Sequence, residues 1–125
     1  MKEIISTDNA PKAVGPYSQA VRYKDMIYLS GQIAINPETG EYERDTVADQ
    51  TRRCMENIKA VLAASGATLE NVLKFDIFLS SMDHFQEMNE VYASYFPDNH
   101  PARITVASAG IFDDLDVEMA VVAGL

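Results

Sequence analysis

The hydrophobic positions of the chain follow two periods, one of two residues and one of about 3.6 residues. Apolar and polar side chains alternate along residues 72–79, which predicts a strand with one buried face. Shorter apolar or alternating runs predict further strands at 1–6, 17–23, 26–30, 101–108 and 115–119. Turn residues separate several of these runs, for example Lys24-Asp25 and the segment 36–40 (Asn-Pro-Glu-Thr-Gly).

Two segments show helical spacing instead. Cys54, Ile58, Val61 and Leu62 form one apolar stripe, in a helix that Thr46 would cap and that Ser65-Gly66 would end. A second helix is expected at about 84–96, with Phe85, Met88 and Tyr92 on its apolar face. The predicted order is β-β-β-α-β-α-β-β. It indicates one α+β domain over residues 1–125, a mixed β-sheet with two helices packed on one face.

The last two predicted strands are close enough in sequence to form an antiparallel pair. With their apolar faces together, Arg103 and Glu118 would lie on the same side of the sheet, directly across from one another. A one-residue slip would move a strand's side chains to the other face, so this register is a hypothesis. It predicts a guanidinium and a carboxylate on one patch of sheet, suited to a small anion.

Composition narrows the class of partner. The chain has 125 residues and a net charge of −9, which disfavours nucleic acid as a partner, because phosphate binding relies on cationic side chains. One cysteine excludes an internal disulfide. The N-terminus lacks a signal-peptide core, and no run is apolar enough to cross a membrane, so a cytoplasmic location is expected.

Few residues are candidates for chemistry. Arg103 has the planar fork that binds carboxylates in a bidentate manner. Glu118 lies in a mostly apolar strand, where partial desolvation would raise its pKa and let it accept a proton from water. A structural ion pair between the two is an equally good interpretation. Cys54 fits a core position, and no motif for zinc, calcium, phosphate or a dinucleotide is present, so no metal and no cofactor are expected.

The segment Gly15-Pro16-Tyr17-Ser18 places a phenol directly after a rigid break, where Tyr17 could close a pocket or pack in the core. Ser30 and Gly31 end a strand with a small hydroxyl and a glycine whose N–H can approach a ligand, although a bulge or turn explains them equally well.

Five motifs occur in order along the chain: Gly-Pro-Tyr-Ser-Gln-Ala at 15–20, Ser-Gly-Gln at 30–32, Asn-Pro-Glu-Thr-Gly at 36–40, Pro-Ala-Arg at 101–103 and Val-Glu-Met at 117–119. Together they closely resemble the RidA (YjgF) family of reactive enamine/imine deaminases, from about residue 8 to the C-terminus. The resemblance implies a chorismate-mutase-like fold and a homotrimer with sites in clefts between subunits. It also implies cofactor-free hydrolysis of 2-imino acids, such as 2-aminoacrylate, to 2-oxo acids and ammonia.

The resemblance implies roles for the candidate residues. Arg103 would clamp the substrate carboxylate, with the Gly31 N–H adding a bond, and Glu118 would position and deprotonate the attacking water. Tyr17, Ser30 and Asn89 match family pocket positions. Thr105 stands where many members have cysteine, so a thiol nucleophile is unavailable there, which favours the water mechanism or leaves only a binding role at this site.

Two other functions are compatible with the same fold. One is a non-catalytic sensor that binds small acids. The other is an RNA-acting translation inhibitor, as has been proposed for relatives, and the negative charge and the lack of a basic aromatic surface argue against it.

Overall fold

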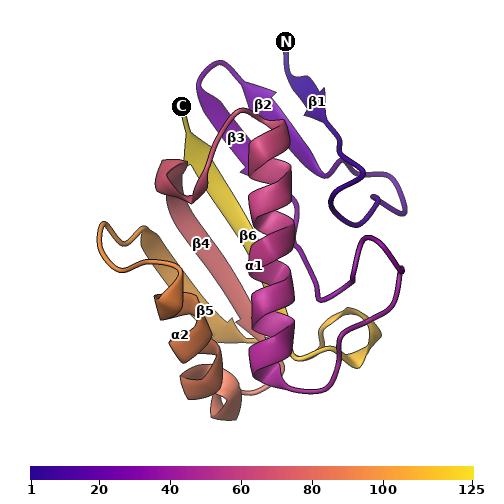
Figure 1. Cartoon of the computed structure of the whole chain (residues 1–125), viewed down its shortest axis with the longest axis vertical. Coiled ribbons are helices and arrows are strands. Elements are labelled where there is room, and N and C mark those ends of the chain that lie inside the picture. Colours follow the sequence, from indigo (N-terminus) through magenta and orange to yellow (C-terminus); the bar gives the residue numbers. More distant parts are fainter.

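The computed structural model describes all residues from 1 to 125 and shows one twisted sheet with two helices on one face (Figure 1). The strands are β1 (Glu3–Ile5), β2 (Ala20–Tyr23), β3 (Met26–Leu29), β4 (Val72–Leu79), β5 (Ala102–Ala107) and β6 (Val117–Gly124). The helices are α1 (Val47–Ala64) and α2 (Phe85–Ser94), and short 3₁₀ turns cover 69–71, 82–84 and 112–114. The predicted fold class and element order are therefore confirmed.

The order of strands in the sheet differs from the prediction at its C-terminal end. The order is β1-β2-β3-β6-β4-β5, so β4 lies between the two strands that were expected to form a hairpin. β5 is an edge strand parallel to β4, and β6 runs antiparallel to both β4 and β3. The predicted β5–β6 hairpin is thus wrong. The long alternating strand β4 can pair on both sides, and α2 supplies the crossover that a parallel pair requires.

Helix α1 forms as its sequence predicts. The Thr46 side chain accepts a hydrogen bond from the Asp49 N–H at 3.0 Å, which satisfies one of the free amides of the first turn. The predicted apolar stripe is fully buried. α2 is shorter than predicted at both ends: the segment 82–84, which Ser81 caps, forms a 3₁₀ turn before the α-helix begins at Phe85, and the helix ends at Ser94 with Tyr95 as its C-cap.

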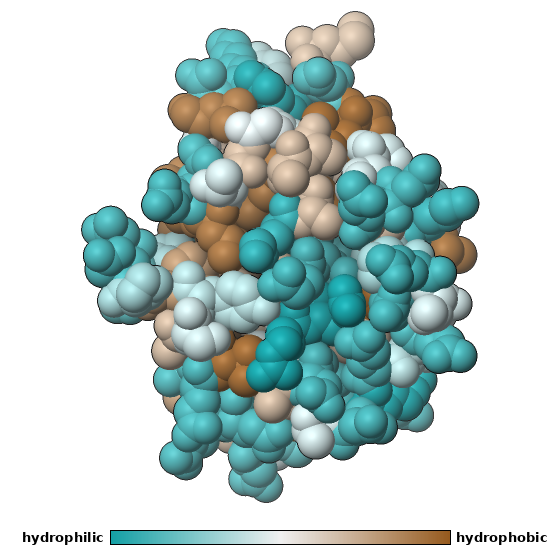
Figure 2. Space-filling model, viewed as in Figure 1, coloured by the Kyte–Doolittle hydropathy of each residue, from teal (hydrophilic) through white to brown (hydrophobic).

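The core lies between the helices and one face of the sheet. Phe75, Ile77 and Leu79 of β4 are completely buried there beside the inward residues of β6. An edge-on aromatic contact joins Phe75 to Tyr92 of α2, with ring centroids 5.1 Å apart. The surface over the two helices is mostly hydrophilic (Figure 2), as expected for amphipathic helices that use one face for packing.

The other face of the sheet, which we call the open face, carries no helix. Tyr28, Phe78, Ile104 and Val106 are exposed large side chains there, with between 36% and 50% of their surface accessible. Ile104 and Val106 therefore do not join the core beneath the helices, so the apolar side of β5 faces away from it. A row of exposed aromatic and aliphatic side chains on one sheet face is typical of a surface that is covered by a partner.

A buried polar group joins α1 to the start of β6. Gln50 is 1% exposed, and its side chain accepts from the Asp116 N–H at 2.8 Å and donates to the Asp116 carboxylate at 3.1 Å. Ser80 also donates to this carboxylate, at 2.7 Å. These hydrogen bonds fix the last turn before β6.

Neither helix is long and apolar enough to cross a membrane.

Candidate functional site

A cavity of about 600 Å³ opens between the loops that precede β2, the segment after β3 and the turn before β6. Four of the predicted site residues line it, namely Tyr17, Ser30, Gly31 and Glu118. The remaining lining residues are Pro11, Lys12, Val14, Gln19, Gln32, Ile33, Ile35, Tyr42, Phe112 and Asp113. The volume is in the range of pockets that bind small organic molecules.

Glu118 points into this cavity from the central strand β6. Its side chain is half-buried on the open face, in register with Phe78 of β4. Desolvation raises the pKa of Glu118 above the ordinary value of a glutamate, and no neighbouring cation of the chain offsets this effect. A carboxylate in such a position is a competent base for a bound water.

Gly31 lies directly against Glu118. The neighbouring Gln32 exchanges two backbone hydrogen bonds with Met119 of β6, at 2.7 and 3.0 Å, and this bridge holds the segment beside the glutamate. A Cβ atom at position 31 would collide with the Glu118 carboxylate. Glycine is therefore required for the backbone to come this close to the glutamate.

Tyr17 and Ser30 form another part of the wall. Gly15 adopts a positive φ of +124°, and the chain then turns so that the half-exposed Tyr17 lines the cavity, with its hydroxyl accepting from the Val14 N–H at 3.4 Å. The Ser30 hydroxyl donates to the Ser18 carbonyl at 2.6 Å, which leaves its oxygen lone pairs available.

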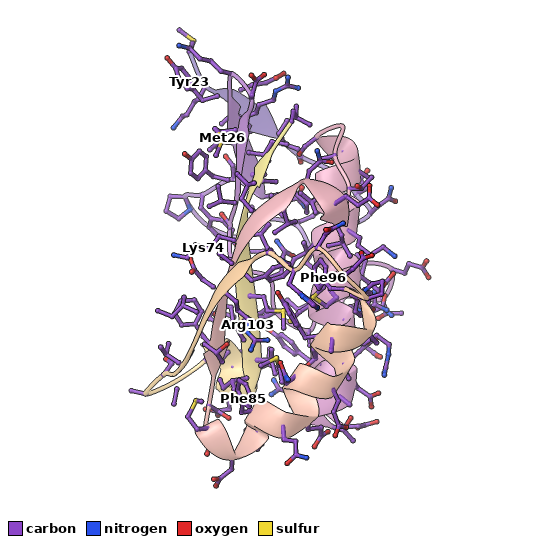
Figure 3. All side chains as sticks on the ribbon, turned by 90° about the vertical axis from the view of Figure 1, so that its left-hand side faces the viewer. Tyr23, Met26, Lys74, Phe85, Phe96 and Arg103 are labelled. Atoms are coloured by element: carbon purple, nitrogen blue, oxygen red, sulfur yellow. The ribbon has the colours of Figure 1, made fainter.

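Arg103 and Asn89 meet elsewhere, between the edge strand β5 and α2. The Arg103 guanidinium donates to the Asn89 side-chain oxygen at 2.6 Å. In Figure 3, Arg103 lies beside Phe85 near α2, whereas Lys74 points away from the helices. Thr105 follows on the same face of β5, and its buried hydroxyl has no hydrogen-bond partner.

The two groups of predicted site residues do not meet within one chain. Arg103 pairs in register with the core residue Phe75, so its side chain lies on the helix face of the sheet. Glu118 pairs with Phe78, whose side chain lies on the open face. The prediction that the arginine and the glutamate share a face is therefore wrong, because it depended on a hairpin that does not form.

Some contacts near these residues were not predicted from the sequence. Phe85 and Tyr92 were assigned only to the apolar face of α2, yet both rings lie against the Arg103 guanidinium. In the sequence, the spacing of these two aromatic residues, four residues before and three residues after Asn89, was the signal that could have indicated these contacts. Tyr42 donates to the Asp113 carboxylate, and Arg44 donates to the Asp113 carbonyl at 2.6 Å, which joins two distant loops at the cavity. Nothing in the local sequence indicates this pairing.

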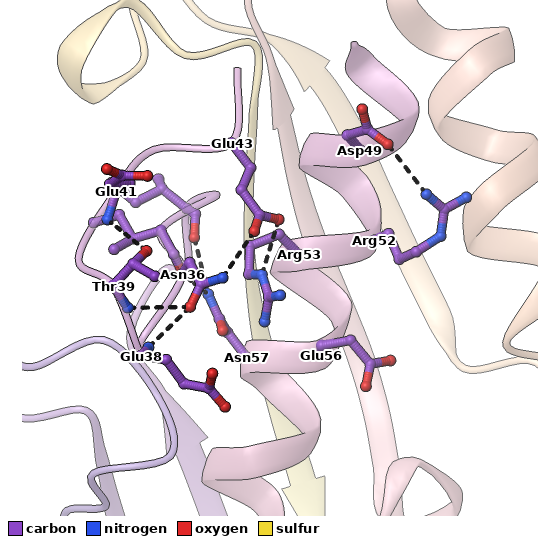
Figure 4. A network of polar contacts seen from close by, with 12 residues as sticks. Asn36, Glu38, Thr39, Glu41, Glu43, Asp49, Arg52, Arg53, Glu56 and Asn57 are labelled. Atoms are coloured by element: carbon purple, nitrogen blue, oxygen red, sulfur yellow. Dashed lines mark hydrogen bonds and ion pairs between the residues drawn. The ribbon is translucent and has the colours of Figure 1, made fainter. Parts of the chain in front are cut away.

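A separate polar network lies on the outer side of α1 (Figure 4). Glu43 accepts from Arg53 at 3.0 Å and from the Asn36 amide at 3.1 Å, and Asn57 donates to two carbonyls of the segment 33–35. These bonds hold the 36–43 loop, part of which lines the cavity, against the helix. No group of three or more histidine, cysteine or acidic residues is arranged to hold a metal ion.

The family of the chain follows from comparison with known proteins. Residues 7–125 match the family described as Endoribonuclease L-PSP. The chain belongs to the RidA/YjgF (L-PSP) family. Among members of this family, a RutC family protein of Pyrococcus horikoshii is 46% identical, over 98% of both chains. The chloroplastic Reactive Intermediate Deaminase A of Arabidopsis thaliana is 40% identical, over 99% of this chain and 66% of that protein.

Solved structures of the RidA/YjgF family share the whole fold. A Thermotoga maritima protein superposes with a TM-score of 0.97 at 48% identity, over 100% of this chain and 98% of its own. Escherichia coli TdcF, solved with bound serine, has a TM-score of 0.94 at 36% identity and 98% coverage of both chains. The resemblance in the five motifs and the chorismate-mutase-like fold that it implied are therefore confirmed.

Proposed function

We propose that the protein hydrolyses reactive 2-imino and enamine acids, such as 2-aminoacrylate and its imine tautomer, to 2-oxo acids and ammonia. The observation that carries the proposal is the half-buried Glu118 carboxylate in the cavity, held beside Gly31, in a chain that belongs to this family. The 40% identical relative named as a reactive intermediate deaminase supports the same chemistry.

The reaction needs an oriented water and a proton carrier. Glu118 takes a proton from water as the water oxygen bonds to the imine carbon, and the C=N electron pair moves to nitrogen, which takes up a proton. In the resulting amino alcohol the nitrogen takes up a second proton and the hydroxyl loses its own, so the C=O bond forms, the C–N bond breaks and ammonia leaves. Oxidation states do not change, so no redox partner is required. Positioning of the water supplies most of the rate acceleration in such a site.

The remaining site residues would bind and enclose the substrate. Arg103 would hold the substrate carboxylate with two parallel N–H donors, and the Gly31 N–H would donate a further bond. Tyr17 would close the cavity, and Ser30 would accept a hydrogen bond from the substrate nitrogen. Asn89 and Thr105 would complete the pocket on the arginine side.

We further propose that the complete site forms between two copies of the chain, within a homotrimer. Since Arg103 and Glu118 lie on opposite faces of one sheet, a site that uses both must take each from a different copy. The exposed apolar side chains of the open face support such an assembly, because they share a sheet face with Glu118 and would be covered by a neighbouring subunit.

A coupled assay tests the function. A serine/threonine dehydratase generates the imine, and release of the 2-oxo acid is followed with and without the protein. We expect the wild-type chain to accelerate release and Arg103→Ala to abolish the acceleration. Arg22→Ala is the matched control, since Arg22 lies on β2 and bonds only to the Lys24 carbonyl. A wild-type protein that leaves the rate unchanged would refute the proposal.

The same samples separate the alternatives. Binding of a 2-oxo acid without any acceleration would indicate a sensor of small acids instead of an enzyme. Salt-dependent binding of RNA would favour an RNA-acting protein, although a net charge of −9 opposes it.

A further inference from the structure

The Arg103 guanidinium is surrounded on one side by three residues of α2. Phe85, Asn89 and Tyr92 are spaced four and three residues apart, which places them on one face of the helix. The guanidinium carbon lies 4.9 Å from the centre of the Tyr92 ring and 5.5 Å from the centre of the Phe85 ring. Both distances are within the range of a favourable cation–π interaction.

The Tyr92 ring is itself rigidly held. It is only 5% exposed, and it contacts Phe75 of β4 and Phe96 after α2, each with ring centroids 5.1 Å apart. Its hydroxyl is buried without a hydrogen-bond partner. The ring therefore acts as an apolar platform beneath Arg103, and the phenol oxygen contributes no polar contact to it.

Asn89 completes the arrangement from the same helix. Its side-chain oxygen accepts from one terminal nitrogen of Arg103, and the guanidinium retains its other N–H donors. Arg103 remains exposed although two rings and one amide surround it on the α2 side. A long arginine side chain that is already ordered loses less conformational freedom when it binds a carboxylate.

We infer that Tyr92 and Phe85 are positioning residues, which hold the Arg103 guanidinium ready for a substrate carboxylate. The inference rests on the proposed function for the identity of the carboxylate. The aromatic rings are what matters, so the Tyr92 hydroxyl is dispensable. Loss of either ring releases Arg103 into several rotamers and weakens substrate binding, with less effect on the chemical step at Glu118.

The test compares Tyr92→Phe, Tyr92→Leu and Phe85→Leu with Tyr95→Leu. Tyr95 is the matched control, because it lies on the same helical segment but bonds to Glu56 and does not contact Arg103. We expect Tyr92→Leu and Phe85→Leu to raise KM by about tenfold with a smaller change in kcat. Tyr92→Phe and Tyr95→Leu keep the wild-type KM. Because Phe85 is only partly buried, Phe85→Leu should fold and can test the inference if Tyr92→Leu does not fold.

A second readout does not depend on turnover. The Arg103 side-chain N–H signal in a ¹H–¹⁵N NMR spectrum, assigned by its loss in Arg103→Lys, reports the mobility of the guanidinium group. We expect a rigid signal in wild type, Tyr92→Phe and Tyr95→Leu, and a mobile one in the other two variants. Folded Leu variants that leave Arg103 rigid and KM unchanged would overturn the inference.

The two proposals fail in different ways. If wild type does not hydrolyse imines but the Leu variants still mobilise Arg103, the positioning role stands and the substrate assignment is wrong. If imines are hydrolysed and Tyr92→Phe is as impaired as Tyr92→Leu, the hydroxyl matters and the positioning role of the ring is wrong.

Discussion

Arg103 and Glu118 lie on opposite faces of the same sheet, separated by strand β4. Each is accessible from its own side, the arginine beside α2 and the glutamate in the cavity of the open face. Under the proposed function, a single chain would therefore carry two half-sites. Because the two residues are separated in this way, mixing two variants can test whether the proposed site is shared between two copies of the chain.

Two inactive variants should restore activity when they are mixed. Arg103→Ala keeps a functional Glu118, and Glu118→Gln keeps a functional Arg103. In randomly mixed trimers, about a quarter of the sites would combine the intact arginine with the intact glutamate. We expect co-refolded mixtures to recover roughly that share of wild-type activity. Mixed oligomers that are seen by mass spectrometry but stay inactive would contradict a shared site.

The raised pKa of Glu118 predicts a pH dependence. As a base it must be ionised, so kcat/KM should fall with decreasing pH at a value above the pKa of an ordinary glutamate. Gln cannot take this role, so Glu118→Gln should lose activity at every pH. If kcat/KM instead fell only at or below the pKa of a free glutamate, the carboxylate would be solvated during turnover.

The raised pKa of Glu118 also makes the stability of the fold depend on pH. The folded chain binds the Glu118 proton more tightly than the unfolded chain, because burial raises the pKa of this group. The stabilisation is therefore present below the unfolded pKa and is lost as pH rises through the folded pKa. Glu118→Gln avoids this loss, so we expect it to gain stability relative to wild type as pH rises from the unfolded pKa of a glutamate through the raised folded pKa. Urea midpoints across this pH range measure the difference.

Gly31→Ala should impair activity without unfolding the chain. The added Cβ collides with the Glu118 carboxylate, which has to move away from its place beside the backbone. We expect a loss of about tenfold or more in kcat, since a small misplacement of a base is costly. Gly110→Ala is the control, because its Cβ would meet nothing within 4 Å. Equal activity of the two variants would argue against a close Gly31–Glu118 contact in the working site.

Gln50→Leu should destabilise the fold. It removes both hydrogen bonds that Gln50 makes to Asp116 and leaves the part-buried Asp116 N–H without its partner. We expect a loss of about 2 kcal/mol in the free energy of unfolding, measured by urea denaturation at fixed protein concentration. Gln86→Leu on the exposed side of α2 provides the comparison, and there the change should be within about 0.5 kcal/mol.

Cys54 should be unreactive in the native protein. It is completely buried, and desolvation raises its thiol pKa well above the ordinary value. At pH 8, we expect an aromatic disulfide reagent to label the chain only after denaturation. Rapid labelling of the native protein would mean that α1 separates readily from the sheet.

The sequence predicted local structure well because local chemistry determines it. The Thr46 cap and the α1 stripe each depend on neighbouring residues, and each is present as expected. The alternation along β4 holds from Phe75 to Leu79, but Leu73, which it places on the buried face, is 52% exposed because the strand pairing is irregular there. The cavity residues Tyr17, Ser30 and Gly31 also come together as parts of one wall. Their grouping followed from two motifs that flank the β2–β3 hairpin.

The pairing of the last strands could not be predicted in the same way. Ile104 and Val106 suggested that their side of β5 faces the core, but Arg103 on the other side packs against the rings of α2. An arginine can cover apolar surface with its long stem, so its charge does not mark the solvent face. Proximity in sequence also favoured a β5–β6 hairpin, whereas β4 has the length to accept both strands.

The burial of Cys54 has a practical consequence. Because it is the only cysteine, the native surface carries no thiol of its own. A cysteine introduced at Ala63, on the exposed side of α1 and away from the open face, could carry a fluorophore or a spin label without background labelling. Association of the chains could then be followed in real time through energy transfer or dipolar distances, without mutating the native thiol first.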